Sequence, residues 1–252
     1  VCEVARRPKF LAYLALSGAL VAVNWLCFVY AIDTGRLLHA SLGYFINPLV
    51  SVGLGMLFLG ERLRPLQLAA VALAVTGVAV QTAVVGELPW IALAVAGTFG
   101  CYGLVRKQSP IGPTLGLAVE VALLLPLALA FLALTETLGW SLGKDFAGTD
   151  FLNGSLSPSL QLVAAGVVTA FPLVCFTAAA KRLRLSTLGF VQYVTPTAQF
   201  LIAVIAFNEP FSTAQAVVFA LIWTGVAVFI ADSVRTERDR RRTERFLDPE
   251  PA

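Results

Sequence analysis

The pentapeptide Thr76-Gly77-Val78-Ala79-Val80 occurs a second time, letter for letter, as Thr224-Gly225-Val226-Ala227-Val228, 148 residues further on. Other landmarks repeat at this offset: Cys27-Phe28 matches Cys175-Phe176, Pro48 matches Pro196, and Glu61 matches Glu209. One stretch slips by two, since Ser41-Leu42-Gly43-Tyr44 matches Thr187-Leu188-Gly189-Phe190. The chain therefore contains a duplicated unit with one small insertion and one small deletion. A repeat in a strongly apolar chain is typical of secondary transporters.

The composition indicates a membrane protein. The chain is 58% hydrophobic and 13% charged, with a mean hydropathy of +0.82, whereas soluble domains contain about 25% charged residues. A bilayer requires helices of about 20 apolar residues, because a helix satisfies its own backbone hydrogen bonds in lipid. The alternative, core helices of a soluble protein, does not explain the charge pattern described next. The sequence predicts eight spans, at 10–32, 38–59, 65–85, 89–105, 114–135, 159–180, 186–207 and 212–232.

The basic residues alternate between the connections of these spans. Lys and Arg collect on the cytoplasmic side of membrane proteins. Only Arg36 and Lys144 fall in the connections of the other set, so both termini are predicted to be cytoplasmic. The sixteen basic residues on the first side are Arg6, Arg7, Lys9, Arg62, Arg64, Arg106, Lys107, Lys181, Arg182, Arg184, Arg235, Arg238, Arg240, Arg241, Arg242 and Arg245.

The repeat and the topology together predict the architecture. The span at 10–32 and its copy at 159–180 are separated by five spans, an odd number, so the two copies cross the membrane in opposite directions. We therefore expect an all-α integral membrane protein, a polytopic helical bundle with an inverted-topology repeat. In such proteins the substrate site lies near the midplane between the halves. This arrangement favours alternating access over a simple pore.

The two copies are unequal, because the second has two additional spans ahead of its Cys-Phe pair. A symmetric protein would have five plus five helices, and the chain begins at Val1 with its only methionine at Met56. We therefore expect that two N-terminal helices of the parent protein are missing. The predicted domains are a partial first repeat of three helices at 1–85, a second five-helix repeat at 86–232, and a basic cytoplasmic tail at 233–252.

Several long strings resemble one known family. They are Ala40-Ser41-Leu42-Gly43-Tyr44-Phe45-Ile46-Asn47-Pro48-Leu49-Val50, Leu57-Phe58-Leu59-Gly60-Glu61-Arg62, Tyr102-Gly103-Leu104-Val105-Arg106-Lys107, Cys175-Phe176-Thr177-Ala178-Ala179-Ala180 and Arg182-Leu183-Arg184-Leu185-Ser186-Thr187-Leu188-Gly189-Phe190. The chain is similar through these strings to RarD-type permeases, in the EamA branch of the drug/metabolite transporter superfamily. The resemblance implies a ten-helix permease of the bacterial inner membrane, built from two inverted five-helix halves. It also implies an association with chloramphenicol sensitivity.

Two prolines mark the candidate substrate pathway. Pro48 and Pro196 lie in the middle of spans, and each removes the backbone hydrogen bond to the carbonyl four residues earlier, on Tyr44 or Gln192. Polar residues in hydrocarbon are costly unless they face the bundle interior or a wet cavity. Hydrogen bonds between helices, and kinks that only shape packing, are the alternative. The polar residues near these prolines are Asn47, Gln192, Tyr193, Thr195 and Gln199.

Four further residues are candidates. Asn24 and Trp25 place an amide and a ring at mid-membrane depth, and Tyr102 lies toward the cytoplasmic end of its span. Packing or an interfacial belt is the alternative for the two aromatic residues. Glu120 is the only charged residue well inside a predicted span, and such a carboxyl could bind a proton or a cationic substrate. A position near the cytoplasmic interface, or pairing with a neighbouring helix, is the alternative for Glu120.

The sequence contains no motif for catalysis, metal binding or a cofactor. His39 is the only histidine, and there is no nucleophile elbow, HExxH, P-loop or dinucleotide fingerprint. A non-enzymatic permease or exporter of small metabolites or drug-like compounds is therefore expected, with neither cofactor nor metal. The expected partners are a small-molecule substrate and the lipid bilayer, with proton coupling possible and no nucleic acid. A channel, a non-transporting scaffold and a membrane enzyme are the alternatives.

Overall fold

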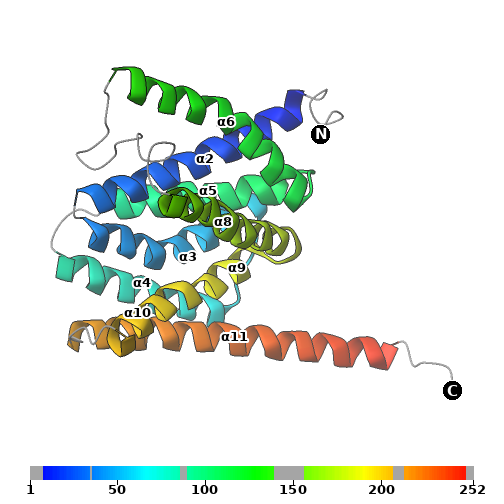
Figure 1. The fold of residues 1–252 in the computed structure, drawn as a ribbon. Helices are drawn as coiled ribbons and strands as arrows, with labels where there is room; N and C mark the ends of the chain where they lie inside the picture. The colour runs from blue at the N-terminus through cyan, green and yellow to red at the C-terminus, as the bar shows by residue number, and fades with distance from the viewer. Residues whose placement is uncertain (1–7, 35, 86–89, 139–155, 207–212, 248–252) are drawn as a thin grey trace. The chain divides into compact units, whose positions relative to one another are not determined.

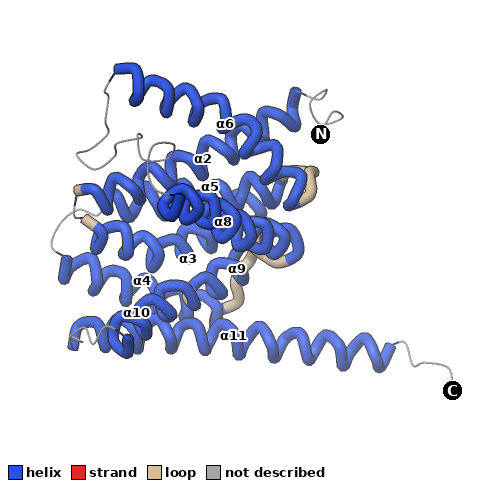
Figure 2. The backbone as a smooth tube through the Cα atoms, in the orientation of Figure 1, coloured by secondary structure: helices blue, strands red, loops and turns tan. Residues whose placement is uncertain are grey.

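The computed structural model describes residues 8–34, 36–85, 90–138, 156–206 and 213–247 (Figure 1). Within these ranges the ordered elements are all helices, as Figure 2 shows. They are α2 (Pro8–Asp33), α3 (Leu37–Leu59), α4 (Pro65–Val85), α5 (Trp90–Gln108), α6 (Pro113–Leu138), α8 (Leu156–Arg182), α9 (Leu185–Gln192), α10 (Val194–Ala206) and α11 (Thr213–Leu247).

Every predicted span corresponds to a helix or a helix pair. Four segments of the described chain are long and apolar enough to cross a membrane: Pro8–Asp33, Pro113–Phe131, Val163–Arg182 and Ala216–Thr236. Shorter apolar helices at Gly43–Leu59 and Pro65–Val80 add to them. The fold class predicted from the sequence, an all-α membrane helical bundle, is confirmed.

Two elements differ from the predicted spans. The segment predicted at 186–207 is broken into α9 and α10 at Tyr193. The helix predicted to end at 105 continues as α5 through Gln108, and it takes Arg106 and Lys107 into its last turn. Basic side chains are favourable at a helix C-terminus, where the carbonyl ends of the peptide dipoles gather. Arg106 is therefore a helical residue and not a loop residue.

The turn between α3 and α4 follows directly from its sequence. Gly60 adopts a φ of 62°, a left-handed conformation that glycine adopts without strain, and the amide of Glu61 donates to the carbonyl of Gly55 at 3.0 Å. Pro65 then occupies the first position of α4, where no backbone donor is needed. Gln67 completes the N-terminus by accepting from the amide of Arg64 at 3.1 Å.

The contacts divide the chain into two compact units. The first contains residues 1–37 and 97–185, and the second contains 38–96 and 186–252. Each unit combines helices from both predicted repeats. The units are defined by packing and the repeats by sequence similarity, so the units do not test where the repeats begin and end. The repeat boundaries therefore remain a prediction. Helix α5 contributes its first turns to the second unit and its last turns to the first unit.

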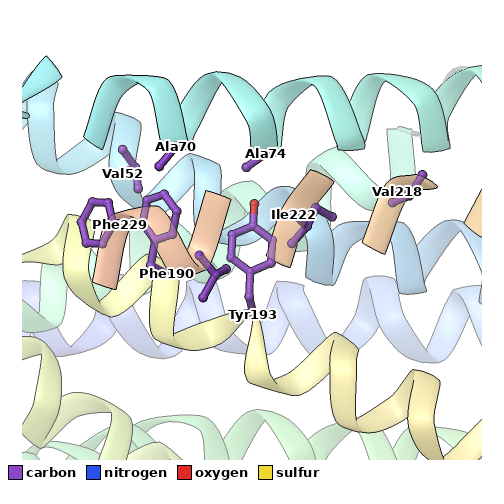
Figure 3. Packing of buried hydrophobic residues seen from close by; sticks show 9 residues of the cluster. Val52, Ala70, Ala74, Phe190, Tyr193, Val218, Ile222 and Phe229 are labelled. Atoms are coloured by element: carbon purple, nitrogen blue, oxygen red, sulfur yellow. The ribbon is translucent and has the colours of Figure 1, made fainter. Parts of the chain in front are cut away.

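The second unit is built around the packing of α4 against α11, the two helices that carry the duplicated pentapeptide. Its buried cluster also draws on α3 and α9, and Figure 3 shows Phe190 lying against Phe229, with ring centroids 3.9 Å apart. Tyr193 points its hydroxyl toward α4 (Figure 3). The buried members are Val52, Ala70, Ala74, Phe190, Tyr193, Val218, Ile222, Val226 and Phe229.

The two duplicated glycines make equivalent contacts at the α4–α11 crossing. A Cβ atom on Gly225 would lie 2.7 Å from the carbonyl oxygen of Ala70. A Cβ atom on Gly77 would lie 3.4 Å from the carbonyl oxygen of Val218 and 3.0 Å from Cγ1 of Ile222. Val218 is the counterpart of Ala70 at the 148-residue offset, so the contact is reciprocal.

The same contacts give the direction of the two helices. An early residue of α4, Ala70, meets the later Gly225 of α11, whereas the later Gly77 meets the earlier Val218. At the start of α4 the guanidinium of Arg64 binds Asp232, which follows Gly225 along α11, with 2.7 Å between Nη2 and Oδ2. The copies of the pentapeptide therefore lie on antiparallel helices, as an inverted repeat requires.

The first unit contains α2, α6 and α8 together with the last part of α5. Helix α2 packs against α6, and α6 packs against α8. A buried cluster of Leu14, Ile111 and Val119 joins α2 to the start of α6. The rings of Phe99 and Phe176 lie with their centroids 4.8 Å apart and join α5 to α8.

Candidate functional site

In the second unit the chain breaks its helix beside a buried amide pair. Pro196 has no N–H to donate to the carbonyl of Gln192, so one regular helical hydrogen bond is missing at this turn. The amide of Tyr193 instead donates to Phe190 at 3.2 Å, and the hydroxyl of Thr197 donates to the carbonyl of Tyr193 at 2.8 Å. Helix α9 ends at Gln192, and α10 begins at Val194.

The side chain of Gln192, at this break, contacts the side-chain amide of Asn47, which precedes Pro48 on α3. Nδ2 of Asn47 donates to Oε1 of Gln192 at 2.8 Å, and Asn47 is 7% exposed. Gly189 permits the approach of α9 to α3, because a Cβ atom there would lie 2.6 Å from the carbonyl oxygen of Pro48. The two amides therefore contact each other directly. Their role in substrate binding remains a prediction.

Three polar atoms at this place have no hydrogen-bond partner. They are Oδ1 of Asn47, Nε2 of Gln192 and the hydroxyl oxygen of Tyr193. A buried polar group without a partner costs about 1–3 kcal/mol, so such groups in a folded protein need an explanation. The amide pair leaves one acceptor and one donor available, and the tyrosine hydroxyl can be either.

The other candidates of the second unit flank this pair. Tyr44 is half-buried one turn before Pro48 on α3, and Pro196 is buried near the start of α10. Gln199 lies on α10, but its side chain is outside the described residues. The backbone thus places these candidates on the helices that carry the buried amides.

In the first unit Glu120 lies in a buried charged cluster. The hydroxyl of Ser17, on α2, donates to Oε1 of Glu120, and Nε of Arg106 lies 3.4 Å from the same oxygen. Arg106 and Ser17 are 0% exposed, and Glu120 is 1% exposed. The alternative that Glu120 pairs with a neighbouring helix is therefore the observed arrangement.

The guanidinium of Arg106 is held against the start of α6. Its Nη2 donates to the carbonyl of Pro113 at 3.0 Å, and it lies 3.4 Å from that of Gly112. Gly116 makes room for it, because a Cβ atom at that position would overlap the guanidinium. Nη1 of Arg106 and Oε2 of Glu120 have no hydrogen-bond partner. The pair is thus fully buried and incompletely coordinated.

The cytoplasmic side assigned to Arg106 from the sequence remains a prediction, but its place in a connection was wrong, because Arg106 is buried in the last turn of α5. The carboxylate of Glu120 offsets the cost of burying its charge, and the carbonyls at the start of α6 accept its hydrogen bonds. One signal was available. A carboxylate predicted inside a span requires a partner, and Arg106 lies at the end of the span just before the one that contains Glu120. Ser17 carried no such signal.

The remaining candidates of the first unit are Tyr102, Asn24 and Trp25. Tyr102 is buried, with its hydroxyl 3.4 Å from that of Thr177 on α8. Asn24 donates to the hydroxyl of Thr98 at 3.0 Å. Trp25 is 47% exposed, and its ring meets Phe28 edge-on. Trp25 therefore faces outward from this unit.

The residues described offer no metal centre, since no three His, Cys, Asp or Glu side chains among them are grouped to hold an ion. Two buried polar clusters lie among the candidate residues that the structure describes. One is an uncharged amide pair at a helix break, and the other is an ion pair that joins α5 to α6.

Comparisons with known proteins agree with these observations. Residues 3–83 match the EamA-like transporter family. Protein RarD of Salmonella typhi is 48% identical over 240 residues, which cover 95% of this chain and 79% of that protein. An uncharacterized transporter of Pseudomonas aeruginosa is 47% identical over 94% of this chain and 76% of its own length. Protein RarD of Escherichia coli is 46% identical over 92% of this chain and 75% of its own.

A solved structure shares the fold. It has a TM-score of 0.64 and 23% sequence identity, and the match covers 93% of this chain and 80% of that one. The extent and level of identity to the RarD proteins go further than the fold, since they span almost the whole chain. The protein is therefore a multi-pass membrane protein that belongs to the RarD group of the EamA-like transporter family.

Proposed function

We propose that this protein is a secondary transporter that carries a small organic solute across the bacterial inner membrane by alternating access. The observation that carries this proposal is the reciprocal contact of α4 with α11. The duplicated glycines, Gly77 and Gly225, lie on antiparallel helices and face equivalent positions. In inverted-repeat transporters the two halves exchange conformations, which opens the same site to either side in turn.

The amide pair of Asn47 and Gln192 is the proposed contact with the solute. Its unpartnered acceptor and donor, with the hydroxyl of Tyr193, suit an amide or hydroxyl group. Pro48 and Pro196 lack the N–H of a regular helical hydrogen bond, so their helices can change their bend at these positions without breaking one. Tyr44 and Gln199 complete this part of the proposed pathway. Asn24, Trp25 and Tyr102 are the proposed pathway residues of the first unit.

Glu120 is the proposed site of proton coupling. A cation bound to its carboxylate would lie next to the guanidinium of Arg106 and would be repelled, so the geometry favours a proton over a cationic substrate. Glu120→Gln keeps the size and the hydrogen bond from Ser17 but cannot titrate. Transport driven by a pH gradient is expected to collapse in this variant while solute exchange survives.

The proposed orientation, with both termini in the cytoplasm, is tested by labelling single cysteines in a cysteine-free background. A cysteine replacing Asp145 is expected to react with an impermeant maleimide from the periplasmic side, and one replacing Arg182 is not. The reverse pattern would contradict the orientation.

Transport itself is tested in proteoliposomes loaded with a mixture of bacterial metabolites and chloramphenicol. A relative from Pseudomonas aeruginosa, 32% identical, is named for sensitivity to chloramphenicol. Alternating access predicts that an internal solute accelerates entry of the same labelled solute, with no ion conductance. A channel gives conductance without exchange, and a scaffold gives neither.

The matched variants are Gln192→Leu, which removes the proposed contact, and Gln108→Leu, which makes the same replacement at an exposed position of α5. Exchange is expected to fall only in the first variant. Equal exchange in both variants would remove the amide pair from the pathway.

A further inference from the structure

We propose that Arg106 is a binding site for the carboxylate of an organic anion, and that Glu120 admits the anion only together with a proton. This inference rests on the proposed transport function and names the chemical class of its substrate. It starts from a fact of charge. A guanidinium does not deprotonate in proteins, so a fully buried Arg106 needs a compensating negative charge in every state of the protein.

Glu120 supplies that charge in the observed state, but with poor geometry. A guanidinium and a carboxylate prefer two parallel hydrogen bonds at about 2.7–2.9 Å. Here one carboxylate oxygen lies 3.4 Å from Nε, and the angle does not make a hydrogen bond, so Nε and Nη1 have no hydrogen-bond partner. The best donors of the guanidinium are therefore not used by its own counter-ion.

The other contacts hold the guanidinium and the carboxyl in place independently of each other. Nη2 of Arg106 is fixed by the carbonyl of Pro113, and its plane lies against Gly116. Oε1 of Glu120 is fixed by the hydroxyl of Ser17, which can also accept a hydrogen bond from a neutral carboxyl. Both groups thus retain partners when the ion pair between them is replaced.

Charge balance then requires that the anion and a proton bind together. In the observed state the pair carries one positive and one negative charge. When an anion binds Arg106, Glu120 takes one proton from water and becomes a neutral carboxyl, so the buried net charge remains zero. An anion alone would add an uncompensated negative charge, and a proton alone would leave Arg106 unpaired, and both are costly in a low-dielectric interior. Anion and proton are therefore bound together.

The surrounding groups do not replace Glu120 in this role. Tyr102 of α5 interacts with both Glu120 and Arg106, and its hydroxyl lies 3.4 Å from that of Thr177 on α8, but a phenol carries no charge near neutral pH. Ser17 is the polar group that α2 contributes. Lys181 of α8 is positive, interacts with Arg106, and donates to the carbonyl of Ser109. It favours an added anion in both protonation states. The coupled proton is thus assigned to Glu120.

The test is calorimetric titration of the purified chain with formate, acetate and benzoate, between pH 5 and 8, in two buffers of different ionisation enthalpy. Uptake of one proton per anion is expected, with a dissociation constant that rises about tenfold per pH unit where Glu120 is ionised in the empty protein. Benzamide, the neutral counterpart of benzoate, is expected to show no proton uptake. Binding of the anions without protons, or no binding of any of the three, would overturn the proposal.

Variants separate the two residues. Glu120→Gln imitates the protonated carboxyl, so anion binding is expected to become independent of pH and to take up no proton. Arg106→Gln alone leaves Glu120 without its counter-ion and can fail to fold. The double variant Arg106→Gln/Glu120→Gln restores neutrality and is expected to fold and bind no anion. Anion binding by the folded double variant would disprove the role of Arg106.

The outcome is distinct from that of the transport assay. Solute exchange in proteoliposomes without proton-linked anion binding would refute this inference and leave the transporter proposal standing. Proton-linked anion binding without exchange would support the site and refute the transporter.

Discussion

Alanine at the duplicated glycines is expected to affect stability unequally, although the glycines are counterparts. In Gly225→Ala the new methyl would lie 2.7 Å from the backbone oxygen of Ala70, which cannot move without moving α4. In Gly77→Ala it would lie 3.0 Å from Cγ1 of Ile222, a side-chain atom that can shift. Gly53 is the control, because a Cβ atom there has nothing within 4 Å.

The magnitudes follow from two opposing terms. Replacing glycine by alanine inside a helix stabilises it by up to about 1 kcal/mol. Overpacking a close contact costs about 1–3 kcal/mol. The free energy of unfolding is therefore expected to rise by up to about 1 kcal/mol in Gly53→Ala, to change little in Gly77→Ala, and to fall by about 1–2 kcal/mol in Gly225→Ala.

The measurement is equilibrium unfolding of the purified protein in mixed micelles of dodecyl sulfate and a non-ionic detergent, followed by circular dichroism. The order of the three variants is the critical result. If Gly225→Ala stabilised the protein as much as Gly53→Ala, α11 would not approach the backbone of α4 so closely. The reciprocal packing would then be refuted, and with it the observation on which alternating access rests.

Three other perturbations test the amide pair, the helix break and the start of α4. Asn47→Leu is expected to weaken solute binding by about 1–3 kcal/mol through loss of a buried hydrogen bond, measured by equilibrium binding, and unchanged affinity would place the contact elsewhere. Pro196→Ala is expected to close the break between α9 and α10 and to change the rate of single-turnover transport more than the affinity; a changed affinity at constant rate would contradict this. Asp232→Asn removes the charge bound by Arg64 and is expected to lower the free energy of unfolding by about 1 kcal/mol, an effect that added salt reduces. The same loss at high and low salt would show that the charge is not responsible.

Much of the fold could be predicted from the sequence because each span must satisfy its own backbone hydrogen bonds. Apolar runs therefore locate the helices. The break at Tyr193 was not predicted, because a proline alone does not decide it: α3 continues through Pro48. The pairing of Asn47 with Gln192 could also be predicted, because it follows from two kinks in an inverted repeat.

The ion pair could not be predicted in the same way. A positively charged residue at the end of a span has the same pattern whether it lies in water or is buried, and only the position of its partner decides between them. Arg106 and Glu120 come together because the turn at Gly112 and Pro113 folds α6 back, and Gly116 leaves space for the guanidinium. The hydroxyl of Ser17 arrives from α2, about one hundred positions earlier in the chain. Such a cluster depends on tertiary packing, which a periodic pattern does not encode.

The reciprocal contact between α4 and α11 has the form of an interface between two identical molecules. In a two-fold dimer, residue i of one subunit meets residue j of the other, and j meets i in return. Gly77 with Val218 and Gly225 with Ala70 satisfy this relation within one chain. Their geometry is that of a two-fold interface contained within one chain. Because both sides belong to one chain, they need not be identical, and Ala70 and Val218 already differ.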